Sequence, residues 1–225
     1  LLVLRKNGIS RISINPQTMK QKTLDLIGRH HTVEQTIESF RMARKLGFDN
    51  INMDLIMGLP EEDLADVRNT MEILKELDPD NITIHSLAIK RAARLNIFKD
   101  RYESMMMVNT QEHMDLVADC AAQMGLFPYY LYRQKNIAGN FENVGYAKVD
   151  KAGIYNILIM EEKQSIIAAG AGASTKIVLK NPIPMPGSKK KKMTRLIRQE
   201  NVKAVDAYID RIDEMIERKG EWLWH

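Results

Sequence analysis

The sequence predicts an α/β protein: the C-terminal part of an incomplete (βα) barrel, followed by a smaller α+β domain. Strand-like and helix-like segments alternate through the first ninety residues, and the predicted strands start near residues 11, 51 and 82. A spacing of about thirty to forty residues fits successive βα units with right-handed crossovers and parallel strands. Three strands are too few to close a barrel, and the chain starts at Leu1 rather than at a methionine, so we expect earlier units to precede it.

The first βα unit has clear boundaries. Residues 11–15, RISIN, form a short strand, and residues 32–46 repeat apolar side chains at helical spacing. Thr32 is the predicted N-cap of this helix, and Gly47 ends it. The apolar face of the helix consists of Val33, Ile37, Phe40, Ala43 and Leu46.

A second helix joins the next two strands. INMDLI, residues 51–56, is the second strand, and residues 61–77 are predicted to form a helix that opens with acidic side chains, as its N-terminal dipole favours. Pro79 stops this helix, and ITIHSLAI, residues 82–89, is the third strand. Strands this apolar predict a sheet that is covered on both faces.

The character of the chain changes after the third strand, and we place a domain boundary near residue 95. The barrel part is then 1–95, and the α+β domain is 96–225. Within the latter we expect a helix over 102–124, which Gly125 ends, and strands at 127–134 and in ENVGYA. The remaining predictions are a hairpin with its tip at Glu161–Ser165, the loop NPIPMPGSKKKK, and a helix over 202–218 with Val205, Tyr208, Ile209, Ile212 and Ile216 inward.

Composition restricts the class of protein. With 225 residues, 44% hydrophobic and 28% charged, the chain can bury the core of one or two domains. No apolar run approaches the roughly 18 residues of a membrane span, and no signal-peptide pattern is present, so we expect a cytoplasmic protein with no membrane partner. The net charge of +4 equals the run Lys189 to Lys192, and without interleaved aromatic residues that run predicts a solvated loop and no nucleic-acid partner.

Sulfur-containing residues indicate core packing. Cys120 is the only cysteine, which excludes an intrachain disulfide and a cysteine metal site completed by this chain. Its helical, apolar surroundings predict a small core residue. The methionines Met105 to Met107 are likewise predicted to fill a core or an interface, because three adjacent thioethers do not form a metal-binding motif.

Three polar residues are candidates for a ligand site. Asp54 lies near the C-terminal end of an apolar strand, where a carboxylate needs a partner and where parallel α/β folds bind their ligands. Gln17 follows the first strand, and Arg29 stands in the IGRHH turn. If they converge, an amide, a guanidinium and a carboxylate would bind a zwitterion that carries hydroxyl groups. The equally weighted alternative is an ion pair between Asp54 and Arg29 that only ties a loop to the strand.

Other motifs favour structural roles. GAGAST, residues 170–175, lacks the third glycine of a dinucleotide-binding loop, although its small side chains leave a ligand-lining role open. His30 and His31 have no partner at a helical offset and indicate a polar loop. Packing is also the default for the tyrosines of the strand at 127–134, although a planar apolar substrate could contact them: Tyr129, Tyr130 and Tyr132.

The order of these segments resembles a known family. GISRISINPQTMKQKTLDLIGRHHT, GFDNINMDLIMGLPEE and NITIHSLA are similar to segments of the oxygen-independent coproporphyrinogen III dehydrogenases and their relatives among the radical S-adenosylmethionine enzymes. The resemblance is most specific over residues 8–88. It continues more loosely to about residue 174, through YYLYRQKNIAGNFENVGYA and AAGAGAS.

This resemblance implies a cofactor and a reaction. Such enzymes hold a 4Fe-4S cluster on the cysteines of a CxxxCxxC motif, and the cluster cleaves S-adenosylmethionine to a 5′-deoxyadenosyl radical. The radical takes hydrogen from propionate side chains of coproporphyrinogen III, a tetrapyrrole, which lose carbon dioxide and become the vinyl groups of protoporphyrinogen IX. By motif position, Gln17, Arg29 and Asp54 would contact the polar parts of S-adenosylmethionine, and Ile56 and Ala88 would flank its adenosine.

The chain also departs from the family pattern. It has no CxxxCxxC motif, so we expect the cluster ligands upstream of Leu1 and no activity from this chain alone. Asn15 and Pro16 replace a glycine and a small apolar residue that relatives commonly carry. ENVGYA stands where the haem-chaperone branch carries an HNxxYW-like motif, which favours the dehydrogenase.

Two other functions stay open. One is a haem-binding or haem-delivery protein on the same scaffold, and the other is a natural piece that serves only as an interaction domain. A barrel that lacks strands would also expose a sheet edge, through which the chain is expected to oligomerise or aggregate.

Overall fold

The computed structural model describes residues 1–88, 107–133, 139, 141–186 and 192–223. These residues form two compact units, Leu1–Gly153 and Ile154–His225. The first unit contains α1 (Leu2–Lys6), β1 (Arg11–Ser13), α2 (Gln21–Ile27), α3 (Val33–Lys45), β2 (Asn50–Met57), α4 (Leu64–Leu77), β3 (Asn81–Ser86), α7 (Gln111–Gln123), β4 (Phe127–Tyr132) and β5 (Asn143–Ala147). The second contains α8 (Ile154–Met160), β6 (Ser174–Pro184), β7 (Met193–Glu200), α9 (Val205–Asp210) and α10 (Ile212–Leu223).

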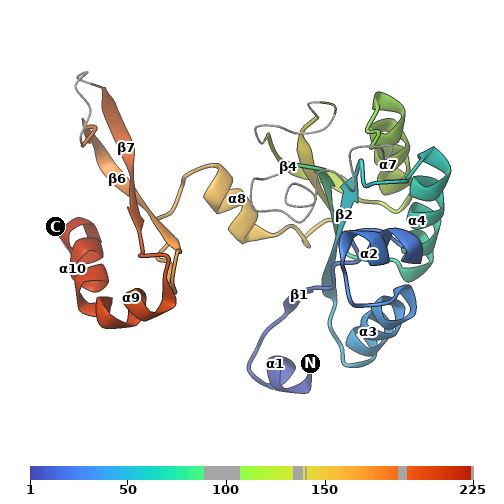
Figure 1. Cartoon of the computed structure of the whole chain (residues 1–225), viewed down its shortest axis with the longest axis horizontal. Helices are drawn as coiled ribbons and strands as arrows, with labels where there is room; N and C mark the ends of the chain where they lie inside the picture. The colour runs from blue at the N-terminus through green and yellow to red at the C-terminus, as the bar shows by residue number, and fades with distance from the viewer. Residues whose placement is uncertain (89–106, 134–138, 140, 187–191, 224–225) are drawn as a thin grey trace. The chain divides into compact units, whose positions relative to one another are not determined.

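The first unit is built on a five-stranded sheet of order β1-β2-β3-β5-β4 (Figure 1). β1, β2 and β3 are parallel neighbours, which confirms the predicted succession of βα units. β5 then pairs antiparallel with β3, and β4 pairs antiparallel with β5. β1 is therefore one edge of the sheet, and association of chains through that edge stays a prediction.

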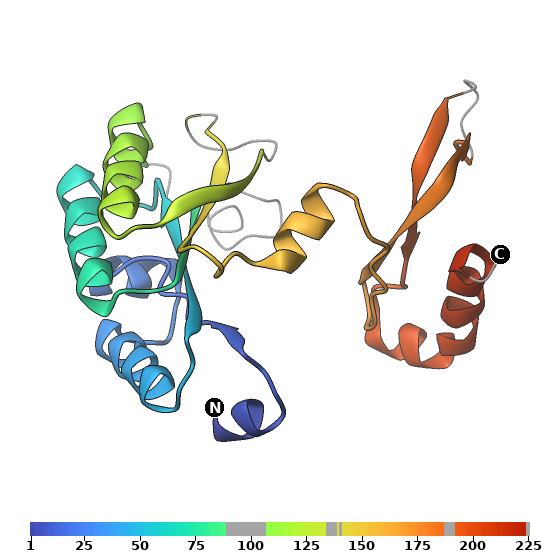
Figure 2. The ribbon, with the colours of Figure 1, turned by 180° about the vertical axis from the view of Figure 1, so that it is seen from behind.

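Helices cover one face of this sheet. α2, α3, α4 and α7 lie on the same side of it (Figure 1, and from behind in Figure 2). Ile51, Met53, Leu55 and Met57 of β2 point into that layer, and none is more than 1% exposed. The intervening side chains, from Asn50 to Ile56, belong to the other face, because successive side chains of a strand alternate. This second face is mostly polar, but Asn52 and Thr83 on it are each only 3% exposed, which agrees with the predicted cover on both faces.

The predicted signals at the ends of α3 are confirmed. The Thr32 side chain accepts from the Gln35 backbone N, and the Gln35 side chain accepts from the Thr32 backbone N, which is a capping box. Gly47 follows the last turn with φ +83°, where a glycine avoids steric strain.

The predicted start of α4 at Glu61 is wrong by three residues. Asp63 is the N-cap, since its carboxylate accepts from the backbone N of Ala65 and Asp66. Glu61 has φ +60°, so it belongs to the turn that GLP begins and not to the helix. The Asp63 cap determines where the helix starts, and the acidic residues before it do not.

The predicted helix over 102–124 is shorter where it is described. Residues 102–106, with Met105 and Met106, lie outside the described residues, and α7 begins only after its N-cap Thr110. Thr110 is held by His113, whose Nδ1 lies 2.8 Å from the threonine hydroxyl. Cys120 is free and 6% exposed inside the apolar core, as predicted.

The domain boundary differs from the prediction. Residue 95 itself lies outside the described residues, and the compact units divide between Gly153 and Ile154. The physical reason is that α7 packs beside α4 in the core of the first unit, and β5 and β4 extend the sheet beyond β3. Residues 96–225 are therefore not one unit.

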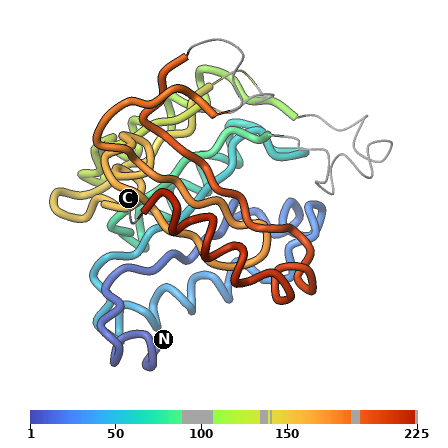
Figure 3. Tube along the Cα trace, turned by 90° about the vertical axis from the view of Figure 1, so that its left-hand side faces the viewer, coloured from blue at the N-terminus to red at the C-terminus, as the bar shows by residue number. Residues whose placement is uncertain are grey.

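The second unit combines a hairpin with two helices. β6 and β7 pair antiparallel from Ser174 with Glu200 to Pro184 with Met193. α10 runs beside this hairpin (Figure 3), where the Arg218 guanidinium donates to Gln199 Oε1 at 3.1 Å. The predicted hairpin with its tip at Glu161–Ser165 is wrong, because residues 154–160 form α8. A short apolar run has no period that separates a strand from a helix.

The predicted C-terminal helix is also corrected. Arg211 interrupts it between α9 and α10, which shifts the helical phase of the second half. Met215 is the buried residue of α10, at 2% exposure. Of the five residues predicted to point inward, Tyr208 is half-buried, and its hydroxyl accepts from the Gly170 backbone N at 3.1 Å. The other four are exposed by 43% to 62%: Val205, Ile209, Ile212 and Ile216. Among the described residues, no helix is both long and apolar enough to cross a bilayer.

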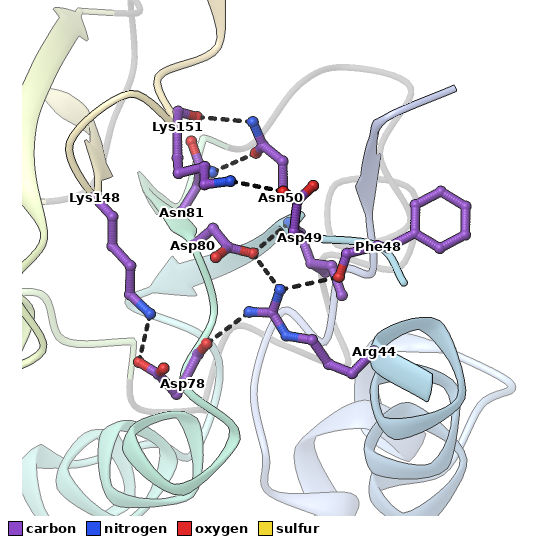
Figure 4. A network of polar contacts seen from close by, with 10 residues as sticks. Arg44, Phe48, Asp49, Asn50, Asp78, Asp80, Asn81, Lys148 and Lys151 are labelled. Atoms are coloured by element: carbon purple, nitrogen blue, oxygen red, sulfur yellow. Dashed lines mark hydrogen bonds and ion pairs between the residues drawn. The ribbon is translucent and has the colours of Figure 1, made fainter. Parts of the chain in front are cut away.

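A polar network holds the N-terminal ends of β2 and β3 (Figure 4). Asp80 Oδ2 accepts from the Arg44 guanidinium at 2.6 Å and from the Ile51 backbone N at 2.8 Å. Arg44 also donates to the carbonyl oxygens of Phe48, at 3.1 Å, and Asp78, at 2.8 Å. The side chain of Asp80 is only 8% exposed. This buried ion pair therefore fixes two strands and a helix at one edge of the sheet.

The same edge carries further structural contacts. Asn81 Nδ2 donates to Asn50 Oδ1 at 2.8 Å, and Lys148 pairs with Asp78 at 2.7 Å. In (βα) barrels the N-terminal ends of the strands serve stability, and ligands bind at the opposite ends. A ligand site is therefore expected at the C-terminal ends of β1, β2 and β3.

Candidate functional site

Polar side chains of two neighbouring strands form a row on the sheet face opposite to α2, α3, α4 and α7. Asp54 of β2 is in register with Thr83 of β3, and Ile56 with His85. The Thr83 hydroxyl donates to Asn52 Oδ1 at 3.1 Å, and Asn52 Nδ2 donates to Asp54 Oδ1 at 2.7 Å. These hydrogen bonds orient the Asp54 carboxylate near the edge where the loops after the parallel strands meet.

Gln17 lies directly beside this row in a strained backbone conformation. Its φ of +68° is rare for a residue other than glycine. Its backbone N donates to the Asp54 carbonyl at 3.0 Å, and its carbonyl accepts from the Ile56 backbone N at 2.9 Å. Gln17 is 7% exposed, and its Nε2 lies 3.5 Å from the Asn15 carbonyl. Strained residues persist where the surroundings hold them, and they cluster at ligand sites.

Asp54 presents a charged acceptor at this edge. Its Oδ2 lies 3.8 Å from His85 Nε2, and its side chain is 25% exposed. Burial acts to raise the pKa of Asp54, but His85 and the Asn52 amide outweigh it, so the pKa lies below its usual 3.8. The carboxylate is therefore ionised at neutral pH. Its exposed part can accept hydrogen bonds from a hydroxyl or amine of a ligand.

Aromatic side chains continue the row onto β4. Tyr132 OH lies 3.2 Å from His85 Nδ1, and the rings of Tyr130 and Tyr132 are parallel within 5° at a centroid distance of 6.3 Å. Gly145 makes room for this arrangement, because a Cβ there would lie 2.0 Å from the Tyr130 ring. Burial raises the pKa of Tyr130 to about 12, so its hydroxyl stays neutral.

A buried carboxylate joins the loops that follow β1 and β2. Glu62 is 3% exposed, and its Oε1 accepts from the Thr18 hydroxyl at 2.5 Å. Burial raises the pKa of Glu62 above its usual 4.5, and the Thr18 hydrogen bond offsets only part of that rise. A second connection lies nearer to solvent, where Lys20 Nζ pairs with Asp66 at 2.6 Å. The loop that carries Gln17 is therefore tied to the start of α4.

The raised pKa of Glu62 predicts a stability change with pH. A raised folded pKa means that stability from this group is full below pH 4.5 and falls as the pH rises through the folded pKa. Glu62→Gln has no titratable group at this position. Above pH 4.5 the free energy of unfolding of this variant is therefore expected to rise relative to that of the wild type. Urea unfolding of both proteins at pH 4, 5.5 and 7 measures this difference. A difference that stays constant with pH would show that Glu62 does not titrate abnormally.

The structure brings some of the predicted site residues together. Gln17, Asp54 and Ile56 are neighbours through the backbone bridge between Gln17 and Leu55. Ile56 and Ala88 are half-buried, and Ala88 is the last described residue before 89–106. Arg29 follows α2 and is exposed. The alternative ion pair between Asp54 and Arg29 is not formed, since Asp54 contacts Asn52 and His85 instead.

Besides the tyrosines of β4, the other motifs have surroundings of their own. His31 lines a hollow of about 470 Å³ that Ile14 and Met42 also border, between the β1 edge and α3. GAGAST runs into β6 of the second unit, where Asn201 Nδ2 donates to the Gly170 carbonyl at 2.7 Å. Most of the lysine run, at 189–191, lies outside the described residues.

Sequence reasoning missed three residues of this edge, and it named Tyr132 only as a contact open to a planar apolar substrate. Thr18, Glu62 and His85 become neighbours of the predicted site only through folding. A signal existed for His85, because polar Asn81, Thr83 and His85 alternate with apolar residues in NITIHS and so share one strand face. For Glu62 the signal was weak, since acidic residues beside a predicted helix start are common.

Comparison with known proteins shows similarity to one superfamily. Residues 1–74 match the radical SAM superfamily. The chain is 47% identical over 178 residues to the oxygen-independent coproporphyrinogen-III oxidase-like protein HemZ of Bacillus subtilis, an alignment that covers 79% of this chain and 36% of that protein. The chain is thus similar to the radical SAM superfamily over residues 1–74 and to HemZ over most of its length. It spans well under half the length of this curated relative.

Two further relatives extend this result. The chain is 33% identical over 90 residues to the heme chaperone HemW of Bacillus subtilis, which covers 40% of this chain and 24% of that protein. The solved structure of coproporphyrinogen III oxidase (HemN) from Escherichia coli matches with a TM-score of 0.62 at 18% identity, over 94% of this chain and 45% of that chain. At this identity the likeness shows the fold, and it confirms the predicted incomplete radical SAM barrel.

The radical SAM superfamily, which residues 1–74 match, implies S-adenosylmethionine and a 4Fe-4S cluster in general. The cluster ligands are not in this chain: Cys120 is its single cysteine and is buried in the apolar core. Among the residues that the structure describes, no group of three or more His, Cys, Asp or Glu side chains is arranged to hold a metal ion. The residues present therefore do not fit the cluster.

Proposed function

We propose that this chain supplies the side of an S-adenosylmethionine pocket that binds the adenosyl group, within a radical SAM oxidoreductase. The observation that carries the proposal is the ionised Asp54 carboxylate, held by Asn52 beside the strained Gln17 at the C-terminal ends of parallel strands. A partly exposed carboxylate of this kind suits the paired hydroxyl groups of a ribose. Ile56, in the same row, offers an apolar surface for a purine ring.

The remaining predicted contacts rest on the family resemblance. We propose that Arg29, which is exposed, binds the carboxylate of the methionyl part, because a guanidinium can form two parallel hydrogen bonds with it. Ala88 is proposed to flank the adenosine together with Ile56. Both assignments agree with the family resemblance of the segments that contain them.

The proposed reaction is the oxidative decarboxylation of coproporphyrinogen III propionates to vinyl groups, in haem biosynthesis. The similarity to HemZ, over most of this chain, supports this substrate class. The cluster ligands are not in this chain, so the proposal assigns to it the binding of S-adenosylmethionine and of the tetrapyrrole, and not the complete reaction.

A haem-binding or haem-delivery protein is the second candidate, and the similarity to the heme chaperone HemW favours it. The segment ENVGYA bears on the choice. Its Asn143 is 1% exposed and donates from Nδ2 toward the Tyr132 carbonyl, and its Tyr146 packs in the hydrophobic core. Both side chains are thus engaged in the fold, which supports the oxidoreductase.

Binding measurements distinguish the two candidates. Equilibrium dialysis of the chain against radiolabelled S-adenosylmethionine is expected to give saturable binding that S-adenosylhomocysteine displaces and guanosine does not. A parallel titration with haem is expected to give no stoichiometric Soret shift. Stoichiometric haem uptake without S-adenosylmethionine binding would replace the oxidoreductase with the haem-delivery function.

A further inference from the structure

The buried Glu62 carboxylate has no ionic partner among the described residues. Its hydrogen bond at 2.5 Å comes from the Thr18 hydroxyl, and both residues are at most 3% exposed. The nearest cation, Lys20, pairs instead with Asp66 and donates to the Glu61 carbonyl. A buried charge without an ionic partner is costly, and such groups are concentrated at functional sites.

Thr18 directly follows the strained Gln17. On one side, the Gln17 backbone is held by its two hydrogen bonds to β2. On the other side, the chain is held by the Thr18 side chain on Glu62 and by the Met19 backbone N, which donates to Thr70 Oγ1 at 3.2 Å. A glutamine at φ +68° needs contacts on both sides, because residues other than glycine are strained in the left-handed region of the backbone dihedral angles and persist there only when their surroundings hold them.

We propose that Glu62 is a positioning residue for the ligand site: by holding Thr18, it keeps Gln17 and its backbone in the conformation that binds the adenosyl ligand. This inference rests on the proposed binding of S-adenosylmethionine. Glu62 acts through the loop and makes no contact with the ligand itself. Its acceptor oxygen, rather than its charge, is what the Thr18 hydroxyl needs.

Three variants separate positioning from general stability. Glu62→Ala removes the acceptor, Thr18→Val removes the donor at almost constant volume, and Glu62→Gln keeps an acceptor oxygen without the charge. The first two are expected to raise the dissociation constant for S-adenosylmethionine about tenfold, the effect of a lost buried hydrogen bond. Glu62→Gln is expected to stay within about twofold of the wild type. The double variant Thr18→Val/Glu62→Ala is expected to weaken binding by less than the product of the two single effects, because both single variants remove the shared hydrogen bond.

Asp80→Asn provides a control for lost stability. It weakens the ion pair with Arg44 at the opposite ends of the strands, away from the Gln17 loop. At a temperature at which all variants are folded, as circular dichroism verifies, it is expected to lower the melting temperature and leave the dissociation constant unchanged.

The outcomes that overturn the inference are distinct. If Glu62→Ala and Thr18→Val bind S-adenosylmethionine as the wild type does, Glu62 does not position the loop. If affinity falls in Asp80→Asn in proportion to its melting temperature, the role of Glu62 is only structural. Absence of binding by the wild-type chain overturns the proposed function itself, and the positioning role with it.

Discussion

Asp54→Ala is expected to weaken S-adenosylmethionine binding by about tenfold to a hundredfold while the chain stays folded. Hydrogen bonds to a charged acceptor contribute about 1.5–3 kcal/mol, and each 1.4 kcal/mol corresponds to a factor of about ten. Because the pKa of Asp54 lies below 3.8, the carboxylate is ionised at neutral pH and presents its full charge to a ligand. Calorimetric titration of the chain, wild type and variant, measures the effect.

Two controls accompany this variant. Asp54→Asn keeps an acceptor oxygen and is expected to bind with intermediate affinity. Asp49→Asn makes the same chemical change at an exposed aspartate just before β2, which pairs with Lys151 at 3.0 Å, and is expected to bind as the wild type does. Equal affinity of Asp54→Ala and the wild type would remove Asp54 from the site.

Asp80→Ala is expected to lower the free energy of unfolding by about 3–5 kcal/mol, because it leaves a partly buried guanidinium without its charge partner. It also removes the acceptor of the Ile51 backbone N, which starts the pairing of β2 and β3. Losses of this size approach a large part of the stability of many domains. The measurement is the midpoint of urea unfolding, followed by far-ultraviolet circular dichroism.

Lys148→Met is the matched control for Asp80→Ala. It removes an ion pair at the same edge, but Asp78 in that pair is 64% exposed. Surface pairs of this kind contribute about 0–1 kcal/mol. If the free energy of unfolding of Asp80→Ala also falls by less than about 1 kcal/mol, hydrogen bonds to water can replace those of the network in Figure 4.

The parts of the fold that depend on local signals could be predicted from the sequence. Thr32 and Gly47 mark the ends of α3 by capping alone, and β2 and β3 follow from apolar runs between turn residues. Local signals did not decide the secondary structure where they fit both a strand and a helix. The run IYNILIM suits a strand and a helix equally, and only its tertiary surroundings decide.

The residues of the candidate site likewise divide into those that the sequence could predict and those that it could not. Asp54 and Gln17 could be predicted because a polar residue at the end of an apolar strand is unusual within its own segment. Glu62 and Thr18 are 44 residues apart, and nothing in either segment specifies the other. The position of Arg29 relative to Asp54 could not be decided from spacing, since both an ion pair and a shared ligand fit the same sequence.

Side chains alternate between the two faces of β2, and the two faces are under different kinds of selection. Ile51, Met53, Leu55 and Met57 face the helices, so substitutions there act on folding, whereas the residues between them face the proposed ligand. Because the two sets interleave within one strand, the ligand face can diverge while the core stays unchanged. Related proteins can thus acquire different substrates on one scaffold by accumulating substitutions at every second position.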